Sequence, residues 1–237
     1  MVNSEVNATR TKKQLGRSSF LKFFFGIIAI FFGCIAISFI LYPPPYSMIY
    51  DTISTLGRAD MNPNGWIFFT IALYSAAIGL FPFYKVLHAE LHDQNKIVAG
   101  IMVILYILTS VGLVMAGTFQ EGSEFSRLHL YSAYFGFGGF FLAGIFTWFL
   151  MSGKIKKSPA ETKTKLGIAF LVEIIVMCTG AGLFLTHMIL HETGIIDFDG
   201  APFGIFIGFS FTEWLLVITI FIDKIFMAGI VSNFMKD

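Results

Sequence analysis

Charged residues are scarce in this chain of 237 residues. Asp, Glu, Lys and Arg make up 13% of it, whereas an average soluble domain carries about 25%. Hydrophobic residues make up 56%, and the mean hydropathy is +0.76. One soluble core cannot hold so many apolar side chains, and there is no long basic tract to bind nucleic acid. The composition therefore predicts an all-α, polytopic membrane protein with no nucleic-acid partner.

Cysteines and familiar catalytic motifs are also few. The two cysteines, Cys34 and Cys178, lie inside apolar runs, where we expect them to pack as small hydrophobic side chains. A disulfide framework or a cysteine-based metal site needs more cysteines at closer spacing. The chain has no Walker loop, no G-x-S-x-G motif and no C-x-x-C motif. No lysine lies in the middle of an apolar run, which argues against a retinal Schiff base. A channel filter motif and an internal repeat are missing too, which argues against a channel or a transporter.

Long apolar runs are the most abundant feature. A polar tail, residues 1–19, precedes a single six-helix transmembrane domain, residues 20–237. Each run is long enough to cross a hydrocarbon core about 30 Å thick. Pro82 is expected to kink or end the second helix, because proline lacks an N–H group. The expected spans are residues 20–42, 65–86, 97–119, 128–151, 165–190 and 203–222, with a continuation of the last span to residue 234 left open. Glycines in the fourth span should let helix backbones approach closely: Gly136, Gly138, Gly139 and Gly144.

The basic residues are unevenly distributed between the loops. The tail with Lys22, the second and fourth loops and the end of the chain hold 14 of the 16 Lys and Arg residues. The first, third and fifth loops share only Arg58 and Arg127. Cytoplasmic loops are enriched in Lys and Arg. We therefore expect both termini to be cytoplasmic and the odd-numbered loops to lie outside.

The first loop, residues 42–66, is polar and rich in turn-forming residues. Ile53 and Leu56 lie at helical spacing, which predicts a short interfacial helix that ends at Gly57. Asp51 and Arg58 are seven residues apart and would share one face of that helix. They would either form an ion pair that bridges the loop or, as the alternative, Arg58 would bind a polar lipid head group. The expected head-group residues are Asp51, Ser54, Arg58 and His129.

Histidines gather at the expected outer ends of the helices. His187 and His191 are four residues apart and project from one helix face, a spacing that would bind a divalent transition metal such as zinc if another ligand arrived. Glu192 is the nearest candidate for that ligand. The alternative is that both histidines are ordinary polar residues of a helix end. His129 is similarly either a hydrogen-bonded structural residue or a general base. Further ligand candidates are His129, Asp51, Asp197 and Asp199.

Two carboxylates lie inside apolar runs. Glu173 is about two turns into the fifth expected span, and Glu213 is about ten residues into the sixth. A charged carboxylate in the bilayer costs several kcal/mol, so each should face the bundle and be paired or protonated. Glu213 is the stronger functional candidate, because it faces the end of the bundle that carries the histidines. Asp223 and Lys224 are expected to pair or to extend toward the membrane interface.

Several of these residues form signatures. Tyr50-Asp51-x-Ile53-Ser54-x-Leu56-Gly57 and Asn62-Pro63-x-x-Trp66-x-Phe68 resemble the first-loop signature of the domain-of-unknown-function 998 (DUF998) membrane family. Ala116-Gly117-x-Phe119 with His129-x-x-x-Ala133 is similar to its second signature. Glu213-Trp214 is similar to a pair in the related FRAG/DRAM/SFK superfamily. One departure is Phe119-Gln120, where the family usually has Phe-Pro.

The resemblance implies a role that concerns lipids. Members of the related superfamily act in remodelling of glycosylphosphatidylinositol lipids, in phospholipid asymmetry and in autophagy. The positions that carry over are Asp51, Ser54, Gly57, His129 and Glu213.

Three functions remain open from the sequence. The first is binding or remodelling of membrane lipid in a polar outer pocket, with His129, His187, Glu213 and Ser54 as candidate catalytic residues. The second is a non-catalytic subunit that assembles with other membrane proteins or with itself. The third is a metal-dependent intramembrane hydrolase that uses His187 and His191.

Overall fold

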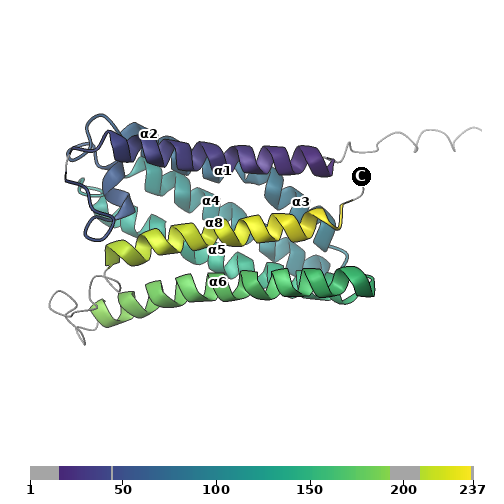
Figure 1. Ribbon diagram of the computed structural model, residues 1–237. Helices are drawn as coiled ribbons and strands as arrows, with labels where there is room; N and C mark the ends of the chain where they lie inside the picture. Colours follow the sequence, from purple (N-terminus) through teal and green to yellow (C-terminus); the bar gives the residue numbers. More distant parts are fainter. Residues whose placement is uncertain (1–15, 44, 193–208, 236–237) are drawn as a thin grey trace, which may run out of the picture.

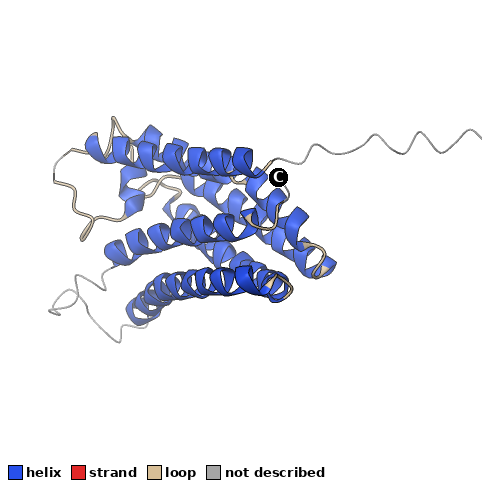
Figure 2. Cartoon of the chain, turned by 45° about the vertical axis from the view of Figure 1, so that its right-hand side comes forward, coloured by secondary structure: helices blue, strands red, loops and turns tan. Residues whose placement is uncertain are grey.

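The computed structural model describes residues 16–43, 45–192 and 209–235. Within these residues the secondary structure is helical, with no strand (Figure 2). The elements are α1 (Arg17–Ile40), η1 (Ile53–Gly57), α2 (Trp66–Gly79), α3 (Phe81–Leu91), α4 (Lys96–Thr118), α5 (Ser126–Lys156), α6 (Ala160–Glu192) and α8 (Phe209–Ser232).

The described residues contain six helical segments that are long and apolar enough to cross a membrane. They are Arg17–Ile40, Trp66–Leu91, Lys96–Thr118, Ser126–Lys156, Ala160–Thr186 and Ser210–Ser232. All six apolar runs predicted from the sequence are therefore confirmed as helices, with ends that differ by a few residues. α8 ends at Ser232, within the continuation to residue 234 that the sequence left open, and the predicted residues 203–208 lie outside the described residues.

The second span is broken in the way that Pro82 predicts. α2 ends at Gly79, and α3 begins at Phe81, with Pro82 in its first turn. Proline has no N–H group and its ring clashes with the carbonyl of the preceding turn. The break therefore lies immediately before the proline, and both halves still contribute to one span, Trp66–Leu91.

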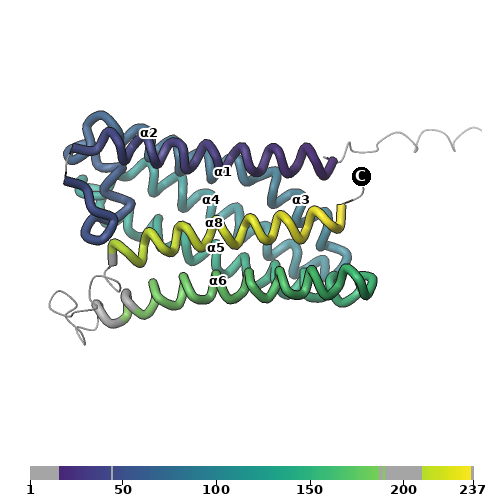
Figure 3. Tube along the Cα trace, viewed as in Figure 1, coloured from purple at the N-terminus to yellow at the C-terminus, as the bar shows by residue number. Residues whose placement is uncertain are grey.

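The helices lie side by side along one axis (Figure 1). α1 begins and α8 ends at the same end of the bundle, which we call the terminal end; η1 lies at the opposite end, which we call the loop end. The tube in Figure 3 shows α6 and α8 running next to each other along their lengths. The most extensive packing joins α4 to α5, α6 to α8 and α1 to α2.

Glycine allows the closest of these contacts, between α4 and α5. A β-carbon built on Gly112 would lie 2.7 Å from the backbone nitrogen of Gly136 and 2.9 Å from the carbonyl oxygen of Ser132. A β-carbon on Gly139 would collide with the Thr109 side chain. The predicted role in close packing thus holds for Gly136 and Gly139. It does not hold for Gly138, because a β-carbon there would contact nothing within 4 Å. Small residues commonly allow such backbone approach in membrane proteins.

The short helix of the first loop differs from its prediction. It is a 3-10 helix, Ile53–Gly57, and all five of its residues are buried. A helix at a membrane interface would expose one polar face. The interfacial helix is therefore not confirmed, and the segment instead packs against α1, α2 and α8 at the loop end.

Candidate functional site

Hydrogen bonds between side chains and backbone groups hold η1 in place at the loop end. Thr52 precedes the helix, and its hydroxyl accepts a hydrogen bond from the Thr55 backbone nitrogen at 3.3 Å. The Tyr46 hydroxyl donates to the Thr52 carbonyl oxygen at 2.9 Å. The Asn62 side chain donates to the Leu56 carbonyl oxygen at 2.9 Å. These bonds satisfy polar groups of a buried segment, and they hold η1 in a fixed position.

Ser54 connects this segment to α8. Its hydroxyl donates a hydrogen bond to Oε1 of Glu213 at 2.8 Å. Glu213 is 4% exposed, and its second oxygen, Oε2, is buried with no hydrogen-bond partner among the described residues. The structure thus joins two sequence candidates that are 159 residues apart. One carboxylate oxygen of Glu213 accepts a hydrogen bond within the fold, and the other can accept a hydrogen bond from a further donor.

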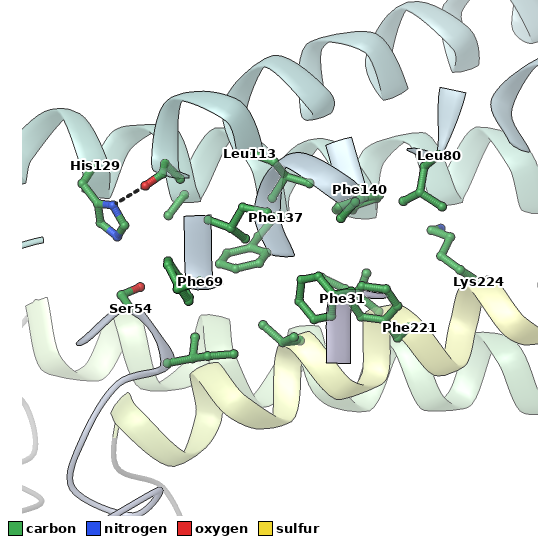
Figure 4. A pocket seen from close by; sticks show the side chains of 17 residues that line it. Phe31, Ser54, Phe69, Leu80, Leu113, His129, Phe137, Phe140, Phe221 and Lys224 are labelled. Atoms are coloured by element: carbon green, nitrogen blue, oxygen red, sulfur yellow. Dashed lines mark hydrogen bonds between the residues drawn. The ribbon is translucent and has the colours of Figure 1, made fainter. Parts of the chain in front are cut away.

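His129, in the first turn of α5, resembles Glu213 in that one of its polar atoms is bonded within the fold and the other has no partner among the described residues. Its Nδ1 lies 2.9 Å from the Ala116 carbonyl oxygen and 2.7 Å from that of Phe119 (Figure 4). Because carbonyl oxygens only accept, Nδ1 carries a proton. The ring is 5% exposed, and Nε2 is buried without a partner. In the neutral ring Nε2 is therefore an unused hydrogen-bond acceptor.

Ser54, His129 and Glu213 line one small polar pocket. Its volume is about 30 Å³, room for about two water molecules. Glu121 adds a second carboxylate and is held by a 3.2 Å hydrogen bond from the Thr52 hydroxyl. The other lining residues are Leu130, Ala133, Tyr134, Phe137 and Phe184. The described residues that line the pocket include two carboxyl groups and no Lys or Arg. The pocket therefore favours a ligand that brings hydrogen-bond donors and positive charge.

An apolar cavity adjoins this polar pocket. Ser54, His129, Ala133 and Phe137 line both spaces. Figure 4 shows the apolar lining extending from His129 and Ser54 at one end to Lys224 at the other. The enclosed volume is about 40 Å³, within a void of about 680 Å³ that includes open space. The cavity is therefore long and narrow, apolar along its sides and polar at its ends.

The known protein families contain a match to this chain. The family described as "Protein of unknown function (DUF998)" matches residues 26–222. The chain belongs to this family. No curated protein matches it, and no solved structure does either. The matched range includes every residue of the polar pocket, so the pocket lies in the part of this DUF998 protein that corresponds to the family.

Arg58 and Asp51 do not form the ion pair that the sequence suggests in this DUF998 protein. Arg58 binds Asp60 through two hydrogen bonds, at 2.7 and 3.1 Å. Asp51 instead accepts a bond from the Ser47 backbone nitrogen at 2.7 Å. The ion-pair prediction was wrong because the loop is a turn followed by a 3-10 helix, so a seven-residue spacing does not place both side chains on one face. The Arg58 guanidinium lowers the pKa of Asp60 through these hydrogen bonds.

The metal prediction rests on side chains that the structure does not describe. His187, His191 and Glu192 belong to α6, but the positions of their side chains lie outside the described part of the chain, as do Asp197 and Asp199. Among the side chains that are described, no group of three or more His, Cys, Asp or Glu residues is placed to hold a metal ion. Zinc binding at His187 and His191 remains a prediction.

A second polar cluster lies at the terminal-end side of the apolar cavity; the sequence pointed to its charged residues Glu173, Asp223 and Lys224 but not to their meeting there. Lys224 is 1% exposed and pairs with Asp223 at 2.6 Å. It also donates to the Tyr106 hydroxyl at 3.2 Å. Glu173, the other predicted intramembrane carboxylate, accepts a 2.6 Å bond from the Trp148 indole and interacts with Asp223. Of the two alternatives expected for Asp223 and Lys224, pairing is confirmed and extension toward the interface is not, because the partners of Lys224 lie inside the bundle.

Proposed function

We propose that this DUF998 protein binds a membrane amphiphile at the loop end of its bundle. The observation that supports the proposal is the continuity of the two cavities. A polar group would occupy the space between Ser54, His129 and Glu213, and an apolar chain would follow Phe137 into the cavity beyond. Ligand sites of this kind are typically apolar spaces with a few convergent polar groups.

The polar groups of the pocket are suited to ligand binding because two of their atoms make no hydrogen bond within the described part of the protein. Oε2 of Glu213 and Nε2 of His129 are buried without partners. A buried polar atom without a hydrogen bond costs free energy, and a ligand that supplies the bond recovers it. Arg58 contributes little to this site, since its guanidinium is occupied by Asp60. Binding through Arg58 and Asp51 is therefore not part of the proposal.

The narrow cavity also indicates the shape of the ligand. Aromatic rings line its length, among them Phe31, Phe69 and Phe137 (Figure 4). The enclosed volume of about 40 Å³ is smaller than an alkyl chain, so a chain can enter only as the side chains that line the cavity move apart, and one slender chain needs less displacement than the two chains of an ordinary phospholipid. The proposal is therefore a single-chain amphiphile, or one chain of a larger lipid whose remainder stays outside.

The proposal can be tested by filling the cavity. Ala133 lines both spaces, so Ala133→Leu would occupy the junction. Gly138→Leu adds a larger side chain to the same helix at an exposed position with nothing within 4 Å of its β-carbon. Native mass spectrometry of the gently extracted protein should find one retained amphiphile in the wild type and in Gly138→Leu, and none in Ala133→Leu. A bare wild-type chain, or equal retention by both variants, would contradict the proposal.

A further inference from the structure

The polar pocket is built almost entirely from hydrogen-bond acceptors. Within the described part of the chain, Glu213 Oε2 and His129 Nε2 have no hydrogen-bond partner, and Nε2 is an acceptor when the ring is neutral. Glu121 lines the same pocket and accepts a bond from Thr52. Ser54 has already donated its hydroxyl hydrogen to Glu213. A group that binds here must therefore bring several N–H or O–H donors of its own.

The charge of the pocket also favours a ligand that carries hydrogen-bond donors. Two carboxyl groups line it, and none of the described lining residues is Lys or Arg. The guanidinium of Arg58, in the first loop, is already paired with Asp60. An ionised Glu213 would then be a buried carboxylate without a partner of opposite charge, which is costly in a low-dielectric environment. A cationic ligand would supply that missing charge, and a phosphate would add a second negative charge beside the first.

We infer that the ligand of this pocket is an amphiphile with a primary ammonium group on a single apolar chain. An ammonium group has three N–H donors, and the pocket offers three acceptors: Glu213, His129 and Glu121. A hydroxyl group has one donor and no charge, so it satisfies the pocket less completely. The inference rests on the proposed function, since it names the head group of the amphiphile whose chain enters the apolar cavity.

The test compares three ligands that share a chain and differ in the head group. Dodecylamine, dodecanol and dodecyl phosphate are added, each in radiolabelled form, to the purified full-length protein in one detergent at pH 8. A primary amine is still protonated at this pH. Wild-type protein should bind dodecylamine at least tenfold more tightly than dodecanol and should bind dodecyl phosphate most weakly. Equal binding of the amine and the alcohol would overturn the inference while leaving the proposed function intact.

Two carboxylate variants locate the effect. Glu213→Gln keeps an acceptor for Ser54 but removes the charge, so the preference for amine over alcohol should disappear while dodecanol binding stays the same. Glu124→Gln removes an exposed carboxylate from the same end of the bundle and should leave the preference unchanged. If Glu213→Gln bound dodecylamine as well as the wild type does, the inference would be wrong.

A third variant covers the case in which Glu213→Gln does not fold. Glu121→Gln changes a less buried carboxylate of the same pocket and should reduce the preference for the amine about threefold. No reduction there would count against the inference. If none of the three ligands binds the wild type better than it binds Ala133→Leu, the proposed function itself fails, a result distinct from a wrong head group.

Discussion

The two polar clusters of the bundle differ in how completely their charges are balanced. At the terminal-end side, the Lys224 ammonium faces the carboxylate of Asp223, and the Glu173 carboxyl lies beside it. One proton shared between the two carboxyl groups would satisfy their unpartnered oxygens and leave the cluster neutral. At the loop end, Glu213 has a hydroxyl partner but no cation among the described residues that line its pocket.

This difference separates a structural cluster from a candidate binding site. A buried group of charges that is internally balanced holds helices together and needs nothing from outside. A buried carboxylate that keeps a free oxygen next to a cavity is incomplete until a ligand or a proton arrives. The apolar cavity lies between the two clusters, and both Ser54 and Lys224 line it. Mutations at the two ends should therefore affect different properties, stability at one end and ligand binding at the other.

The largest expected effect is at the balanced cluster. Lys224→Met removes the cation that Asp223 pairs with, and breaking a buried ion pair from one side costs about 3 to 5 kcal/mol of the free energy of unfolding. The double variant Lys224→Met with Asp223→Leu should recover much of this loss, because no unpaired charge remains. Denaturation in mixed micelles measures both. If Lys224→Met alone were as stable as the double variant, the interpretation that Lys224 balances the charge of Asp223 would be contradicted.

A smaller effect is expected at Ser54. Ser54→Ala removes the hydroxyl donor to Glu213 and leaves a buried carboxylate oxygen without it, which should cost about 1 to 3 kcal/mol. Ser152→Ala is the matched control, because the Ser152 hydroxyl only bonds a carbonyl of its own helix at an exposed position. The two variants should differ clearly in thermal stability. Equal stabilities would mean that the bond between η1 and α8 does not help to hold the loop end.

Glu213→Gln should change stability less than either of these variants. Its amide oxygen still accepts the Ser54 hydrogen bond, and the unbalanced charge is gone. We expect a change within about 1 kcal/mol, smaller than most core substitutions. The same denaturation assay checks this expectation. A loss as large as that of Lys224→Met would show that Glu213 is a structural charge with a partner inside the bundle.

The smallest effect is expected at Arg58. An exposed ion pair contributes about 0 to 1 kcal/mol, so Arg58→Gln should leave stability almost unchanged. Since Arg58 lowers the pKa of Asp60, this contribution is present above the ordinary aspartate value of 3.8 and is lost as the pH falls through the lowered value. Stability measured between pH 3 and 7 tests this. Reduced binding of dodecylamine in this variant would instead place Arg58 in the site.

The spans were predictable because apolar length and Pro82 act locally along the chain. The site was predictable only in part. Ser54, His129 and Glu213 were found as polar residues in suggestive positions, but the bond between Ser54 and Glu213 joins residues 159 apart, which no local pattern reports. The Asp51–Arg58 pair failed because it assumed a regular helix.

The pairing of Lys224 with Asp223 was one of two predicted alternatives, but the burial of Lys224 was not predicted, for a related reason. It lies only two turns from the end of α8, and a lysine there can usually extend to water. Its actual partner, Tyr106, comes from another helix 118 residues away. An adjacent pair of opposite charges, Asp223 and Lys224, inside an apolar run was the signal that could have indicated burial.

The most direct test of the account is an infrared difference spectrum of the carboxyl groups on addition of dodecylamine. Bands are assigned with Glu213→Gln and Glu173→Gln. The account predicts that the ligand shifts the Glu213 band and leaves the Glu173 band unchanged, because only the loop-end cluster is incomplete. A ligand response at Glu173, or none at Glu213, would contradict it.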